Sequence, residues 1–359
     1  MSRVPLPEMP DRVPDQRSEA RLAEIRREAA ERGTVSGKGM LPVGAPFPKA
    51  SSETGYYGVP MLKEPQWTKE VPMYFFVGGA AGAAAVVASA ANLLTNDRDL
   101  VRDARWVAAV GGVISPALLI SDLGVPSRFL NMLRVFKLQS PMNMGAWTLA
   151  AFSTFSGASA FANLLRQKFG EALPIRLVEH SSGALASLTG MVLSTYTGVL
   201  IGATAIPVWN DHAVSLPHHF AASGVNSAVS ILELLGHDDS RGLNLLGMAA
   251  SAFEVYEGIE IEITRDRVNE PLKKGLSGVI VRAGGILSGP VPLALRAASL
   301  ITGNIKLRRT ACWASLVGSL LTRFGWIQAG HASAKDHRIP LQLPERVKEI
   351  RKSSKELAA

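Results

Sequence analysis

The chain has 359 residues, of which 47% are hydrophobic and 19% are charged, and its formal net charge is +8. Soluble domains usually carry roughly 25% charged residues, so this composition favours a membrane protein over a soluble enzyme. The basic residues are dispersed among loops and tails, without a basic groove or an interleaved aromatic platform, which argues against nucleic-acid binding.

Two polar tails are expected to flank a membrane-embedded domain. Residues 1–69 form the N-terminal tail, in which the Glu- and Arg-rich segment 14–32 predicts a short, charged, solvent-exposed helix. Residues 33–69 are a Gly- and Pro-rich approach to the first apolar run. Residues 70–331 form the membrane domain, and residues 332–359 form a polar C-terminal tail.

Apolar runs dominate the central domain. A helix needs about 20 mostly apolar residues to cross roughly 30 Å of hydrocarbon. Eight runs reach or approach that length, namely 71–94, 105–121, 144–165, 183–206, 212–235, 242–263, 275–300 and 310–331. The predicted fold is therefore all-α, a polytopic membrane helix bundle with about eight transmembrane helices. The many Gly, Ala and Ser residues in these runs predict close helix–helix packing.

Asp122 ends the second run, six residues before Arg128 and just before Gly124 and Pro126. Ionisable residues in spans are costly and therefore suggest function. Two interpretations stay open for Asp122. It is a helix-end carboxylate paired with Arg128, or it exchanges protons beside a redox ligand.

Tyr196 lies in the fourth run, within STYTGVLIGATAIPVW. Its phenol can donate a hydrogen bond to a carbonyl oxygen such as that of a quinone, but a bond to a backbone carbonyl is an equally ordinary use. The residue type alone does not decide between the two.

Four carboxylates follow one another in the sixth run, SAFEVYEGIEIEITR. Glu254 and Glu257 are three residues apart and share a helix face, which predicts a proton-transfer path through them. If the helix ends near Gly258, Glu260 and Glu262 lie instead in the headgroup zone.

The histidine and cysteine residues limit which cofactors the chain can hold. Cys312 is the single cysteine, and an iron–sulfur cluster usually takes four Cys ligands. His218 and His219 are adjacent, so they point about 100° apart on a helix and do not supply a haem ligand pair on facing helices. We therefore expect no iron–sulfur cluster, no haem and no metal site in this chain, with haem b kept open as the less favoured alternative.

Four stretches in order resemble the NrfD family, which includes the PsrC-like membrane subunit of polysulfide reductase. They are YYGVPMLKEPQWTKEVPMYFFVGGAAG from Tyr56, LLISDLGVPSRFLNMLRVFKLQSPMNMGAW, STYTGVLIGATAIPVW and SLLTRFGWIQAGHASAKD. The resemblance covers roughly residues 56–337, and the second stretch is its most specific part. The adjacent His218 and His219 depart from the family pattern.

The resemblance implies a quinone-reactive integral membrane subunit of a multi-subunit oxidoreductase in a respiratory chain. Such a subunit exchanges electrons between the quinone pool (ubiquinone or menaquinone) and a ferredoxin-like iron–sulfur subunit, which is attached to a molybdopterin-type catalytic subunit. The quinone pocket is expected between the first four helices. The positions carried over to quinone binding are Glu70, Tyr74, Asp122, Arg128 and Tyr196.

Asp122, Glu254 and Glu257 are the predicted proton-transfer residues, and the predicted location is the inner (cytoplasmic) membrane. Two other functions stay open. A secondary transporter would use the intramembrane carboxylates and helices broken at prolines 116, 207, 217 and 290, but it predicts inverted repeats that the sequence does not show. A passive membrane anchor would hold the enzyme without contacting quinone.

Overall fold

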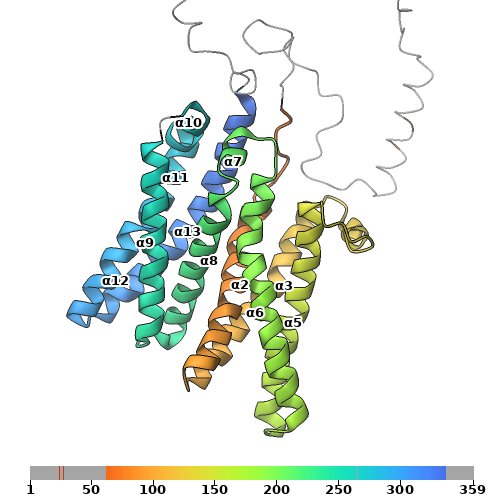
Figure 1. Cartoon of the computed structure of the whole chain (residues 1–359), viewed down its shortest axis with the longest axis vertical. Helices are drawn as coiled ribbons and strands as arrows, with labels where there is room; N and C mark the ends of the chain where they lie inside the picture. The colour runs from red at the N-terminus through yellow and green to blue at the C-terminus, as the bar shows by residue number, and fades with distance from the viewer. Residues whose placement is uncertain (1–23, 25–26, 28–61, 265, 337–359) are drawn as a thin grey trace, which may run out of the picture.

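The computed structural model describes residues 24, 27, 62–264 and 266–336 (Figure 1). Of the predicted charged helix at 14–32, the structure describes only Glu24 and Arg27, and both are helical and exposed, as expected. The beginning of the first family-like stretch and nearly all of the C-terminal tail lie outside the described residues. Within the described part, the regular structure is helical throughout and contains no strand.

The helices of the membrane domain follow one another with short connections. In chain order they are α2 (Glu70–Leu94), α3 (Arg98–Asp122), η2 (Pro126–Arg128), α4 (Phe129–Met132), α5 (Pro141–Phe169), α6 (Leu173–Gly202), α7 (Pro207–Asp211), α8 (Ser215–Leu232), the π-helical turn η3 (Glu233–His237), α9 (Arg241–Ile263), η4 (Arg267–Asn269), α10 (Glu270–Lys273), α11 (Gly275–Ser288), α12 (Pro290–Thr302) and α13 (Ile305–Lys335).

The long helices coincide with the eight apolar runs, if α8 is taken with η3 and α11 with α12. Among the described residues, four of them are long and apolar enough to cross a bilayer: α2, α3, α6 and the α11–α12 segment. The prediction of an all-helical membrane fold is therefore confirmed, whereas the number of eight crossings stays a prediction.

Several helix boundaries differ from the apolar runs. Helix α3 begins at Arg98, seven residues before its run, because the Asp97 side chain caps it by accepting a hydrogen bond from the Leu100 amide at 2.9 Å. Helix α6 begins at Leu173 and ends at Gly202, so its first turns are the polar segment that hydropathy left outside the run. Polar turns extend these helices beyond the apolar stretch that marks them.

Of the four prolines considered as helix breakers, Pro290 interrupts a long helix. Gly289 precedes it with non-helical backbone angles (φ −100°, ψ −94°), and proline has no N–H for the helical ladder. The seventh run therefore forms two helices, α11 and α12. Pro116 lies inside α3, Pro207 begins the short α7 and Pro217 lies in the first turn of α8.

Two helix groups make up the bundle. Helices α2, α3, α5 and α6 form the first group, and helices α8, α9, α11, α12 and α13 form the second (Figure 1). Both α2 and α6 join the groups by packing on α8, and α2 also packs on α13. In its most apolar window 78% of the α2 residues are buried, against 33–44% in the other three candidate spans, so α2 is the central helix.

Glycines allow α2 to approach its neighbours at backbone distance. A Cβ atom built on Gly82 would lie 2.4 Å from the Gly190 carbonyl oxygen of α6. One built on Gly224 of α8 would lie 2.8 Å from the Gly79 carbonyl oxygen. Both crossings leave no room for a side chain, as expected from the density of small residues.

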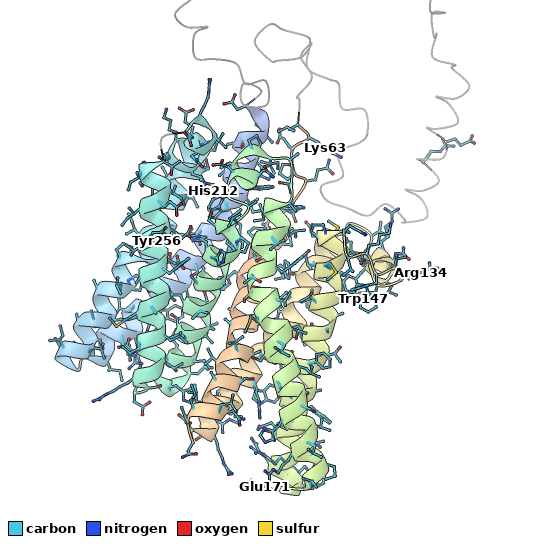
Figure 2. All side chains as sticks on the ribbon, viewed as in Figure 1. Lys63, Arg134, Trp147, Glu171, His212 and Tyr256 are labelled. Atoms are coloured by element: carbon cyan, nitrogen blue, oxygen red, sulfur yellow. The ribbon has the colours of Figure 1, made fainter. Side chains whose placement is uncertain are left out.

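The two ends of the bundle can be told apart by labelled residues. Lys63, His212 and Arg134 lie at one end, which we call the Lys63 end, and Glu171 lies at the opposite end, the Glu171 end (Figure 2). Helix α2 begins at the Lys63 end and α3 returns to it, so Glu70 and Asp122 belong to this end.

Candidate functional site

A cavity at the Lys63 end lies between α2, α3, α5 and α6, and we call it the Tyr196 cavity. Its volume is about 90 Å³, and its walls are mostly apolar and aromatic. Three of the five predicted quinone-binding residues, Tyr74, Asp122 and Tyr196, line it together. Its other lining residues are Trp67, Val71, Phe75, Leu119, Leu123, Phe129, Met132, Met142, Gly145, Ala146 and Leu200.

Asp122 is held by the segment that leads into α2. Its Oδ1 atom accepts a hydrogen bond from the Thr68 backbone amide at 3.2 Å and a second, short one from the Thr68 hydroxyl. The carboxylate therefore lies next to the positive N-terminal end of α2, which stabilises negative charge. No ion pair joins it to Arg128 in the part of the chain that the structure describes, so the interpretation of Asp122 as a partner of Arg128 is wrong.

Tyr196 reaches across from α6 to the beginning of α5. Its hydroxyl donates a short hydrogen bond to the Pro141 carbonyl oxygen, so it makes the backbone bond that was one of its two expected uses. The ring packs directly over Gly145, where a Cβ atom would lie 2.1 Å from the ring. The glycine is therefore required for Tyr196 to occupy this position.

The Tyr74 hydroxyl, unlike that of Tyr196, makes no hydrogen bond to the described residues. Its side chain is almost completely buried, 1% exposed, on the second turn of α2. Among the described residues, its hydroxyl has no hydrogen-bond partner. The Tyr196 cavity therefore contains a donor that is not engaged by the protein.

The remaining two predicted quinone-binding residues stand apart from this cavity. Glu70 lies in the first turn of α2, is partly exposed and does not line the cavity. Arg128 is exposed in the η2 turn and does not line it either. The structure therefore brings three of the five residues together and leaves two at its periphery.

A second cavity, which we call the Glu254 cavity, lies in the other helix group between α8, α9, α11 and α13. Glu254 is 2% exposed, and its Oε2 atom accepts a short hydrogen bond from the Ser288 hydroxyl. Glu257 is also buried on the same face of α9, as predicted, but does not line the cavity.

The end of α9 differs from its prediction in one respect. The helix does not stop near Gly258 but continues to Ile263. Glu260 and Glu262 are nevertheless exposed, and Glu262 forms a two-bond ion pair with Arg282 of α11 at 2.5 and 3.0 Å.

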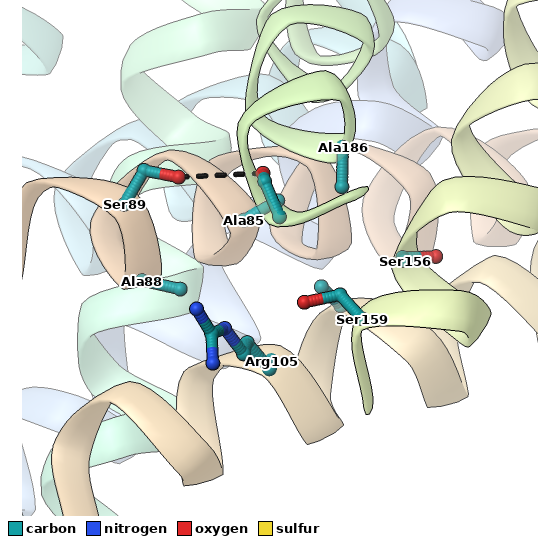
Figure 3. Close-up of a pocket in the computed structure, with 9 residues that line it drawn as sticks. Ala85, Ala88, Ser89, Arg105, Ser156, Ser159 and Ala186 are labelled. Atoms are coloured by element: carbon teal, nitrogen blue, oxygen red, sulfur yellow. Dashed lines mark hydrogen bonds between the residues drawn. The ribbon is translucent and has the colours of Figure 1, made fainter. Parts of the chain in front are cut away.

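Buried charges also gather toward the Glu171 end, away from both cavities. Glu179 is fully buried and pairs with Arg105 by a short bond and with Arg166 at 3.2 Å. A small cavity beside it, lined by Arg105 and Ser159 among others, has a volume of about 10 Å³ (Figure 3). That volume admits about one water molecule, so this cavity is not a ligand site.

Glu233 forms a second buried ion cluster in the π-helical turn after α8. Its carboxylate accepts hydrogen bonds from Arg296 at 2.7 Å and Arg308 at 2.8 Å, and from the thiol of Cys312 at 2.9 Å. All four side chains are buried and none lines a cavity described here, so the cluster is structural.

The sequence did not reveal several residues that shape the two cavities. Trp67 lines the Tyr196 cavity and stacks on Trp209 of α7, with ring centroids 5.3 Å apart. Trp209 in turn donates a hydrogen bond to the Trp326 carbonyl oxygen at 2.8 Å, and Trp326 lines the Glu254 cavity. Trp209 thus links a residue that lines one cavity to a residue that lines the other. The signal available in sequence was the position of Trp67 and Trp326 inside two of the family-like stretches.

Comparison with known proteins bears on the middle of the chain, from the approach to α2 to the end of η3. Residues 61–237 match the family described as polysulphide reductase, NrfD. No curated protein matches the chain. In the described residues, no group of three or more His, Cys, Asp or Glu side chains could hold a metal ion. The matched range contains all the residues that line the Tyr196 cavity.

Proposed function

Because this chain belongs through residues 61–237 to the polysulphide reductase NrfD family of membrane subunits of redox complexes, we propose that it binds quinone or quinol in the Tyr196 cavity. In this role it exchanges electrons between the quinone pool and an iron–sulfur partner subunit. The observation that carries the proposal is the meeting of Tyr74, Asp122 and Tyr196 on one mostly apolar cavity. Apolar walls with a few placed polar groups are typical of sites for small amphipathic ligands.

The chemistry of the cavity fits the two oxygens of a quinone ring. Tyr74 has a free hydroxyl that can donate a hydrogen bond to a carbonyl oxygen. Tyr196 already donates to Pro141, so its oxygen is better suited to accept a hydrogen bond from a quinol hydroxyl. Tyr74 is therefore suited to the oxidised quinone, and Tyr196 to the reduced quinol.

Asp122 supplies the proton acceptor. Thr68 fixes its Oδ1 atom, while Oδ2 has no partner among the described residues. When quinol is oxidised, two electrons leave for the partner subunit and two protons are released. Asp122 takes one of these protons at Oδ2, and water at the Lys63 end takes the other. In quinone reduction Asp122 returns the proton.

The electron partner is another chain in this proposal. Cys312, the single cysteine, is buried and bonded to Glu233, so these residues do not supply the four ligands that a cluster usually takes. The proposed partners are a ferredoxin-like iron–sulfur subunit, docked near the Lys63 end, and a molybdopterin-type catalytic subunit. The proposed location is the inner membrane. Glu254 and Glu257 are proposed as further proton-transfer groups because both are buried carboxylates on one face of α9.

The test is quinol-dependent reduction of the partner's cluster in the purified complex. Asp122→Asn keeps the shape of the side chain but removes the proton acceptor, and we expect the rate to fall by about 10²-fold, as for loss of a general base. Asp99→Asn, on the same helix at the Glu171 end, is the control and should keep the wild-type rate. If Asp122→Asn keeps full activity, the role of Asp122 is refuted. If the wild-type complex shows no quinol-dependent reduction, the chain is a passive anchor.

A further inference from the structure

The Glu254 cavity is the larger of the two. Its volume is about 360 Å³, against about 90 Å³ for the Tyr196 cavity. Its walls are largely apolar and come mostly from α9, α11 and α13, including Val255, Ile261, Val281 and Trp326, with Pro290 at the beginning of α12. A cavity of this size falls within the range of small-molecule sites. The function proposed above gives its Glu254 carboxylate a proton-transfer role but places no ligand in it.

Two buried polar side chains on this cavity lack partners. Both ring nitrogens of His219, which is 5% exposed, have no hydrogen-bond partner, and neither does Oε1 of Glu254. Leaving buried polar atoms unsatisfied is costly, and such atoms in a native structure call for an explanation. A ligand that forms hydrogen bonds with both side chains would satisfy these atoms and explain why the protein leaves them unpaired.

The cavity reaches the lipid-facing side of the bundle between α9 and α11. Ile259 and Ile286 line it and are 53% and 54% exposed, so they face the surrounding hydrocarbon. Gly258 and Gly285 line the same opening, and a Cβ atom on either would meet no atom within 4 Å. This opening gives a ligand access from the membrane, and the exposed ion pair of Glu262 and Arg282 lies at another edge of the same cavity.

We propose that the Glu254 cavity is a second binding site for the ring of a quinol, separate from the Tyr196 cavity. A quinol hydroxyl donates a hydrogen bond to Glu254 Oε1, and a ring oxygen accepts one from a His219 N–H. Trp326, whose ring centroid lies 6.2 Å from that of His219, provides an aromatic wall for the ring. The choice of ligand class rests on the proposed function.

Other membrane molecules fit the cavity less well. A lipid acyl chain would fill the apolar space but leave the His219 ring nitrogens and Glu254 Oε1 without partners. A phospholipid phosphate would bring a negative charge beside the Glu254 carboxylate. Quinol combines an apolar ring with hydroxyl groups, and it therefore matches the walls and the polar atoms together.

The experiment is photolabelling of the purified full-length chain in lipid nanodiscs with an azido-substituted short-chain quinol, followed by peptide mapping. We expect label in two places, on peptides of α9 and α13 and on peptides of α2 and α6. Gly285→Leu fills the cavity from a position with free space, and it should remove the label from α9 and α13 but not from α2 and α6. Gly157→Leu adds the same side chain to α5, also without a close neighbour, and should change neither.

Polar variants test the proposed contacts. Glu254→Gln and His219→Phe should each weaken competition by unlabelled quinol at α9 and α13 by about tenfold, which corresponds to the loss of one hydrogen bond. Label confined to α2 and α6 would overturn the second site and leave the proposed function intact. Label absent from both places would overturn both. Label at α9 and α13 that survives Gly285→Leu would show surface labelling from the lipid and would also overturn the second site.

Discussion

The buried Glu233 cluster gives the sharpest prediction of stability. Glu233 and Arg296 are both 0% exposed, and Arg308 is nearly as buried, at 6%. Replacing Glu233 by alanine removes the common acceptor of two guanidinium groups, at 2.7 and 2.8 Å. Arg308 keeps a bond to the Ser240 carbonyl oxygen, but Arg296 keeps only weak contacts to neutral groups, at 3.3 Å or more.

The magnitude follows from the burial of the charges that remain. Breaking a buried ion pair by removing one partner costs about 3–5 kcal/mol, because the other charge stays in a low-dielectric site. Two arginines are affected here, so we expect Glu233→Ala to lower the free energy of unfolding by at least the middle of that range, about 4 kcal/mol. Asp99→Ala breaks a surface pair with Arg102, whose side chain is 37% exposed, and should cost less than about 1 kcal/mol.

The assay is unfolding of the purified chain in detergent micelles by increasing sodium dodecyl sulfate, followed by tryptophan fluorescence. Labelling of Cys312 by a thiol-reactive dye provides a second probe, because the single cysteine is fully buried in the folded chain. If Glu233→Ala and Asp99→Ala lower the free energy of unfolding by similar amounts, the Glu233 cluster does not stabilise the fold as argued. Replacing Glu233, Arg296 and Arg308 together by methionine should recover most of the loss, since no unpaired charge is then buried.

Two further substitutions test the glycine contacts. Gly145→Ala places a methyl group 2.1 Å from the Tyr196 ring, so the ring must move, and quinol-dependent cluster reduction should fall on the order of 10²-fold; an unchanged rate would remove Tyr196 from the site. Gly82→Ala places a methyl group 2.4 Å from the Gly190 carbonyl oxygen, and should lower the free energy of unfolding by about 1–3 kcal/mol. Gly157→Ala meets no atom within 4 Å and, measured in the same unfolding assay, should leave stability within about 0.5 kcal/mol of wild type.

Much of the fold could be predicted because lipid imposes a simple rule. A span must be apolar over about 20 residues, and each of the eight runs is helical, the seventh as the two helices α11 and α12. The polar beginnings of α3 and α6 could not be read from hydropathy, because capping by Asp97 and exposure at the Glu171 end determine them. The break at Gly289 was visible as a glycine followed by Pro290.

The site was only partly predictable. Tyr74, Asp122 and Tyr196 could be identified from their residue types and the family-like stretches around them, and they meet in one cavity. The hydrogen bond from Tyr196 to the Pro141 carbonyl oxygen and the one from Thr68 to Asp122 each join residues more than fifty positions apart. Hydropathy and motif spacing carry no information on such contacts, so these partners required the structure.

The crossing of α2 and α6 at Gly82 and Gly190 has a mechanical consequence. At a rise of 1.5 Å per residue, Gly82 lies about 12 Å along the axis from Tyr74. Backbones in direct contact do not slide or separate easily, so the crossing acts as a fulcrum. A tilt of only about 5° about it would move α2 by roughly 1 Å at the level of Tyr74. The Tyr196 cavity can therefore widen when the ends of α2 and α6 move apart at the Lys63 end. The backbone contact at Gly82 and Gly190 is kept in this motion.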